Sequence, residues 1–179
     1  MIDDPTAEEA KELYAHLGLA YSCSSVLEHG IANAILILEL MEGRGGAKTR
    51  EEWETIVDKH YEESFEQTLG KLKSHLARHQ QRSSKLSSVI PDLERCVGER
   101  NFLAHHFWRE YATKWFTALG RQEMVQRLTE ARDLFSETDS KLEAAMQPFE
   151  EHYGITPDLE RAAFELIKQE ARAKHWQQS

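Results

Sequence analysis

Hydrophobic residues recur every three to four positions along most of the chain, the period that gives an α-helix one buried face. The first such stripe starts near Pro5 and stops at a glycine cluster around residues 43–46, where we expect the first helix to end. Its members are Leu13, Leu17, Ala20, Ser24, Leu27, Ile31, Ile35 and Leu38. The pattern therefore predicts a long helix that buries a single stripe in a core.

The same period continues through four further segments, which turn-forming residues separate. Thr49 before an acidic run is typical of a helix start, and the Gly154–Pro157 stretch is the clearest turn. We expect the four helices at about residues 49–82, 91–120, 122–152 and 158–175. No alternating strand pattern and no internal repeat occurs in the sequence. These features predict an all-α fold, an up-and-down bundle of four to five helices in one domain that covers residues 1–179.

Charge and composition narrow the class of partner. The 22 basic and 31 acidic residues give a formal net charge of −9, which argues against broad non-specific binding to nucleic acid or anionic lipid. A small local cationic site remains compatible with that balance. The two cysteines, Cys23 and Cys96, lie among apolar residues in helical patterns, so we expect reduced thiols and a cytoplasmic location.

The sequence gives no sign of a membrane segment or a secretory signal. The N-terminal residues are acidic, where a signal peptide would begin with a basic segment. The longest apolar run, residues 31–41, is too short to cross a bilayer and continues the amphipathic stripe. We therefore expect no membrane partner.

One helical segment, ERNFLAHHFWRE at residues 99–110, carries the groups most suited to chemistry. Asn101 and His105 are four residues apart and so share a helix face, whereas Arg100 is offset from His105 by roughly 140° around the axis. We expect packing around them from Leu93, Val97, Ala104, Phe107, Trp108 and Tyr111. This pattern places the polar groups where the helix leaves its own core or faces a second subunit.

These three side chains suit a phosphodiester substrate. A guanidinium binds a phosphate and stabilises the charge that develops on it during the reaction. An amide orients the neighbouring groups, and an imidazole exchanges a proton near neutral pH. The Arg-x4-His spacing, in the form RNxxxH within a late helix of a small all-α bundle, resembles the motif of the HEPN superfamily.

The resemblance implies a metal-independent endoribonuclease that works as a homodimer without a cofactor, often as a toxin or an antiviral effector. His105 would act as general base or acid, Arg100 would hold the scissile phosphate, and Asn101 would position its partners. The substrate would be RNA, because DNA lacks the 2′-hydroxyl nucleophile. A regulatory or antitoxin protein is a further expected partner.

Several alternatives stay open at the level of sequence. An Arg-x5-His spacing also occurs in the family, so His106 competes with His105 as the catalytic histidine. Glu99 and Arg109 flank the motif as auxiliary candidates. Glu99 would tune the charge of the site and Arg109 would contact the phosphate, although ion pairing at the surface also explains the presence of both residues. We expect no metal site, because adjacent histidines on a helix diverge and no Cys-x-x-Cys or Glu-x-x-His pair occurs. The alternative function is a non-catalytic helical protein-interaction module, which the net negative charge favours.

Overall fold

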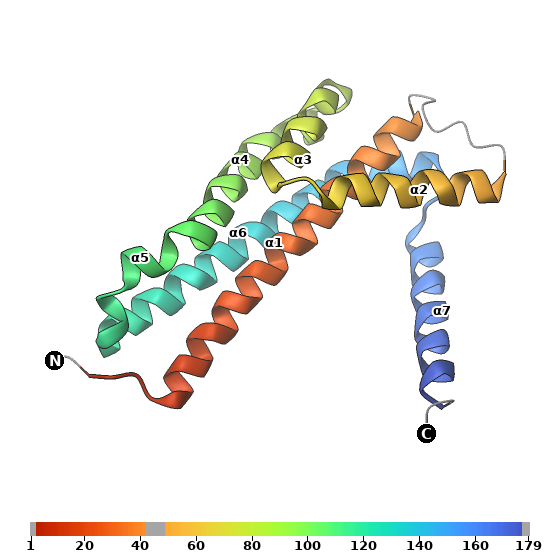
Figure 1. The fold of residues 1–179 in the computed structure, drawn as a ribbon. Helices are drawn as coiled ribbons and strands as arrows, with labels where there is room; N and C mark the ends of the chain where they lie inside the picture. The colour runs from red at the N-terminus through yellow and green to blue at the C-terminus, as the bar shows by residue number, and fades with distance from the viewer. Residues whose placement is uncertain (1–2, 42–48, 177–179) are drawn as a thin grey trace. The chain divides into compact units, whose positions relative to one another are not determined.

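The computed structural model describes residues 3–41 and 49–176, and these residues contain helices and connecting turns but no strand (Figure 1). The elements are α1 (Ala7–Met41), α2 (Arg50–Phe65), α3 (Leu69–Leu76), the 3₁₀ helix η1 (Ala77–Arg82), α4 (Ser84–His105), α5 (Phe107–Tyr111), the 3₁₀ helix η2 (Lys114–Phe116), α6 (Ala118–His152) and α7 (Pro157–Trp176). The all-α prediction is confirmed, while the described residues form more α-helices than the four to five expected. The glycine cluster expected to end the first helix lies outside the described residues.

The chain divides into two compact units, residues 1–145 and 146–179. In the first unit α1, α4 and α6 run side by side (Figure 1), and their apolar stripes form the core. The α1 stripe is buried as predicted, except that Leu17 is half-buried. The facing residues include Leu86, Leu93, Cys96, Leu103, Phe107, Met124, Leu128 and Phe135. Both cysteines are free thiols.

The expected second helix is divided into α2, α3 and η1. Helix α2 ends at Phe65, and Thr68 adopts an extended conformation whose carbonyl accepts hydrogen bonds from two N–H groups of α3. Two side chains attach α2 to α1: the His60 ring bonds the Ala32 carbonyl (2.8 Å) and the Tyr61 hydroxyl donates to Asn33 (2.5 Å). The break therefore lets the chain pack against α1 on either side of a turn.

The expected third helix begins earlier and ends earlier than the sequence pattern indicated. Ser83 is the N-cap of α4, and its hydroxyl accepts a hydrogen bond from the Leu86 N–H, so Pro91 lies inside the helix. The helix ends at His105 because His106 leaves the helical region (φ −123°, ψ −27°), and α5 and η2 follow as short separate elements. Gly120, expected at the end of this helix, lies in the first turn of α6.

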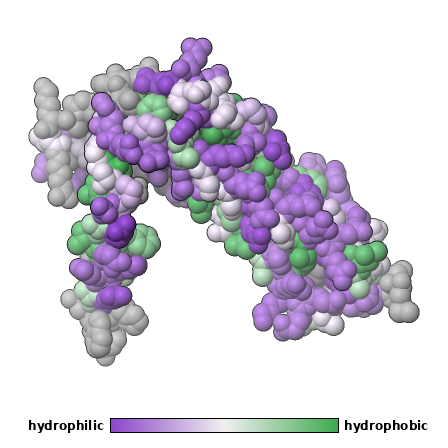
Figure 2. Space-filling model, turned by 180° about the vertical axis from the view of Figure 1, so that it is seen from behind, coloured by the Kyte–Doolittle hydropathy of each residue, from purple (hydrophilic) through white to green (hydrophobic). Residues whose placement is uncertain are grey.

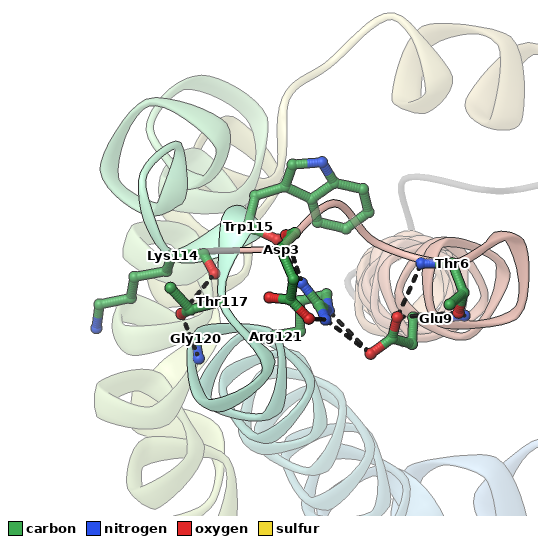
Figure 3. A network of polar contacts seen from close by, with 8 residues as sticks. All are labelled: Asp3, Thr6, Glu9, Lys114, Trp115, Thr117, Gly120 and Arg121. Carbon is green, nitrogen blue, oxygen red and sulfur yellow. Dashed lines mark hydrogen bonds and ion pairs between the residues drawn. The ribbon is translucent and has the colours of Figure 1, made fainter. Parts of the chain in front are cut away.

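A network around Arg121 connects the N-terminal segment, η2 and α6 (Figure 3). The side chain is 6% exposed, and its guanidinium donates to Asp3 (3.0 Å), Glu9 (2.8 Å) and the Trp115 carbonyl (3.0 Å). Thr6 caps α1 and also bonds Glu9 through its N–H (2.8 Å). This buried cation is thus paired and fixes the start of α1 against the start of α6.

The face of the described residues shown in Figure 2 is mainly hydrophilic, with separate hydrophobic spots. Several of these lie on α7, where Leu159, Phe164 and Leu166 are more than half exposed. Of the helices in the described ranges, none combines the length and the apolar character that crossing a membrane requires.

Candidate functional site

The last two turns of α4 carry two of the predicted site residues on an exposed face. Asn101 and His105 are both exposed, and they lie one helical turn apart. Gly98, a turn earlier on the same face, is exposed as well, and a Cβ added there would meet nothing within 4 Å. This face therefore leaves an imidazole and an amide accessible beside a stretch of helix with little side-chain bulk.

Arg100 lies at the border between this face and the core. Its side chain is 34% exposed, and its Nε lies 4.0 Å from Oε1 of Glu28 on α1. Burial raises the pKa of the Glu28 carboxyl, while Arg100 and His29 act against that rise. The guanidinium is thus drawn toward α1 by a partly desolvated carboxylate.

Glu28 lies beside Arg100 of the motif, and the sequence alone did not predict this neighbour. In the sequence it is followed by His29, and that adjacency carries no metal or catalytic signature. It reaches Arg100 only because α1 packs against α4, a long-range contact that the spacing of residues does not reveal.

Glu99 has its own partner on α6. Its Oε2 lies 2.5 Å from the Arg127 guanidinium, and its side chain is only 11% exposed. Its second oxygen, Oε1, is buried and has no hydrogen-bond partner among the described residues. Arg127 in turn stacks over the Phe102 ring, 4.9 Å from its centroid. Glu99 therefore joins α4 to α6, on a different side of the helix from Asn101 and His105.

His106 and Arg109 form a pair of their own at the break between α4 and α5. An Arg109 N–H group lies 3.0 Å from Nδ1 of His106. Because a guanidinium can only donate, Nδ1 of His106 is the acceptor in this contact. The centroids of the His105 and His106 rings are 6.4 Å apart and the rings are nearly perpendicular, so the two imidazoles face different neighbours.

The apolar surroundings of the motif differ from the expected ones. Leu93 and Phe107 are buried as expected, but Ala104 is exposed and Trp108 is 40% exposed. The break at His106 turns α5 away from the line of α4, so residues beyond it do not continue the same stripe. Trp108 instead lies in an aromatic cluster, 5.8 Å from Tyr14 and 5.9 Å from Trp115 between ring centroids.

A single chain does not bring the three motif groups to one point. Among the described residues, no hydrogen bond or ion pair joins Arg100, Asn101 and His105 to one another. The His105 ring and the Asn101 amide are both open to solvent on this face. The Arg100 guanidinium lies on the flank of this face, toward Glu28 of α1, so the guanidinium and the other two side chains of one chain point in separate directions.

Within the described residues, a second group of side chains with metal-ligand chemistry consists of Glu39, His75 and His79, contributed by α1, α3 and η1. No family model, no curated protein and no solved structure matches this chain. The resemblance to the HEPN superfamily therefore stays a prediction from the motif and the helical architecture.

Proposed function

We propose that the protein is a metal-independent endoribonuclease whose site is completed by a second copy of the chain. The observation that carries the proposal is the exposed α4 face, where His105 and Asn101 lie one turn apart with Arg100 at its border. The proposal also rests on the RNxxxH resemblance and on the chemistry of these three side chains with a phosphodiester.

Arg100 supports this role through the weakness of its internal partner. Its Nε lies 4.0 Å from the Glu28 carboxylate, which is the outer limit of an ion pair and not a bidentate contact. A third of the side chain is exposed. The guanidinium can therefore keep Glu28 on one side and still offer N–H groups to a phosphate.

The angular offset within α4 favours a site shared between two copies. His105 and Arg100 differ by roughly 140° around the helix axis, so one phosphate cannot easily contact both from one chain. Two α4 helices related by a twofold axis would place Arg100 of one copy against His105 of the other. The missing side chain at Gly98 and the small exposed Ala104 would allow two such helices to approach closely.

The reaction then follows from the positions of the groups. His105 accepts the proton of the ribose 2′-hydroxyl, and the 2′-oxygen attacks phosphorus while Arg100 of the other copy binds the phosphate oxygens. The bond between phosphorus and the 5′-oxygen breaks, and the departing oxygen takes a proton from water. The products are a 2′,3′-cyclic phosphate and a 5′-hydroxyl end. Asn101 holds the imidazole or the ribose beside it.

RNA cleavage by the purified chain in EDTA tests this proposal. His105→Ala is expected to lower the cleavage rate by at least about 100-fold, since general acid–base groups contribute about 10²–10⁴-fold. His152→Ala, at an exposed helical histidine outside α4, is the matched control and should cleave as the unmodified chain does. Circular dichroism verifies that the helices persist in both variants.

Two outcomes would contradict the proposal as stated. Unchanged cleavage by His105→Ala, with loss in His106→Ala, would assign the chemistry to His106. If the unmodified chain did not cleave RNA at any protein concentration, the proposed ribonuclease activity would be wrong.

The alternative, a non-catalytic helical interaction module, is favoured by one feature of the surroundings. Two of the arginines nearest the motif are already engaged, Arg109 by His106 and Arg127 by Glu99, so few cations are left to attract RNA. If the protein is such a module, it should bind a partner protein and should not cleave RNA at any concentration.

A further inference from the structure

A second cluster of side chains with ligand chemistry lies away from the motif face. Glu39 lies near the end of α1, about 16 Å along the helix from Glu28 at 1.5 Å per residue. His75 belongs to α3 and His79 to η1. One donor atom from each of the three residues lies within 4.8 Å of the others. We propose that these residues bind a divalent transition-metal ion, Zn²⁺ by the chemistry of the donors.

The donor types fit zinc. Two imidazole nitrogens and one carboxylate oxygen form a known three-ligand zinc set that leaves a fourth position for water. Borderline-soft imidazoles select Zn²⁺ over Mg²⁺ or Ca²⁺, which prefer sites built from oxygen. The four-residue spacing of the histidines places both rings on one side of the α3–η1 segment, where their ring centroids are 6.2 Å apart.

The distances are close to those that zinc requires. Zinc bonds of about 2.0–2.2 Å at tetrahedral angles separate neighbouring ligand atoms by about 3.3 Å. Nε2 of His75 and Oε1 of Glu39 are 3.0 Å apart, so this pair already has the required spacing. The third donor lies at most 4.8 Å from them, a gap that small side-chain rotations can close.

Burial supports a ligand site as well. His79 is 6% exposed, whereas the side chains of Glu39 and His75 are each 26% exposed. The cluster is thus mostly shielded from solvent, and the partial exposure of Glu39 and His75 would let a bound zinc ion keep one water ligand. A bound ion would join the end of α1 to the α3–η1 segment, and because it binds only the folded arrangement it would stabilise the protein.

Calorimetric titration of the metal-stripped full chain with ZnCl₂ tests the proposal. We expect one Zn²⁺ per chain and a melting temperature that rises with zinc concentration. Glu39→Gln and His75→Ala change side chains that are partly exposed, so both variants are expected to fold. Loss of an outer-shell partner already weakens metal binding by about 10–100-fold, so removal of a ligand should weaken it at least tenfold.

The controls are histidines elsewhere in the chain. His105→Ala and His152→Ala should bind zinc as tightly as the unmodified chain, and Glu39→Gln should leave RNA cleavage in EDTA unchanged. Failure of the zinc site and failure of the ribonuclease are therefore separate results. No zinc binding, or binding that Glu39→Gln and His75→Ala leave intact, would overturn the proposal. The contact between Glu39 and His75 would then be only a hydrogen bond between α1 and α3.

Discussion

Arg121 shows how one buried charge can position a whole helix start. Its guanidinium is nearly inaccessible, and it bonds Asp3, Glu9 and a backbone carbonyl in the turn before α6 (Figure 3). A buried cation is tolerated only when it is paired in this way, because an unpaired one would lose its hydration without compensation. The network thereby holds the first turn of α1 beside η2 and the start of α6.

The same network predicts a dependence of stability on acid. The Thr6 N–H and then Arg121 lower the pKa of Glu9 from 4.5 to about 2. A carboxyl whose pKa falls on folding stabilises the native state above pH 4.5, and this contribution is lost as the pH falls toward 2. We expect Glu9→Gln to be less stable than the unmodified chain at pH 7, and the difference to shrink steadily below pH 4.5.

Urea unfolding at pH 7, 5 and 3.5 measures that difference. Glu8→Gln is the control, because Glu8 is an exposed neighbour with only a 3.6 Å ion pair to Lys11, and it should stay within about 0.5 kcal/mol of the unmodified chain. A difference between Glu9→Gln and the unmodified chain that is the same at pH 3.5 and pH 7 would contradict this account of the network.

At the scale of elements, periodicity predicted the long helices better than their ends. The expected first, fourth and fifth helices match α1, α6 and α7 closely in the described residues. The breaks after Phe65 and at His106 were missed, because the apolar period continues through both. Caps and contacts with other helices decide those breaks. Ser83, which caps α4, lies in a serine-rich stretch that is compatible with a loop or with the polar end of the preceding helix.

Gly120 illustrates such a contact and gives a prediction. A Cβ at this position would lie 2.2 Å from the Lys114 carbonyl oxygen, so the backbone of η2 would have to move. We expect Gly120→Ala to destabilise the protein by about 1–3 kcal/mol, the usual effect of overpacking. Gly18→Ala is the matched control on α1, where nothing lies within 4 Å of the added methyl.

The control should change stability in the opposite direction. Alanine is favoured over glycine inside a helix by about 1 kcal/mol, so Gly18→Ala should raise the midpoint of chemical unfolding. If the two alanine variants shifted that midpoint equally, the close approach of η2 to α6 would not be a determinant of stability.

At the scale of the whole molecule, sequence reasoning found residues that are local to one another and missed those that packing brings together. Asn101 and His105 could be assigned to one face because helix geometry alone relates them. Glu28 beside Arg100, and Glu39 beside His75, meet only through the packing of α1 against α4 and α3. A single sequence contains no periodic signal for such contacts, so it did not predict the positions of the Glu28 and Glu39 carboxylates.

The central claim is that Arg100 of one copy acts together with His105 of another. It is tested most directly with dimers of two differently tagged chains, purified through both tags. A dimer of Arg100→Ala with His105→Ala keeps one intact pair across the interface, and should cleave RNA in EDTA at about half the unmodified rate. A dimer of the unmodified chain with the Arg100→Ala, His105→Ala double variant keeps no intact pair across the interface, and should be inactive. The opposite result, an inactive first dimer and a half-active second, would place the whole site within one chain and contradict the account.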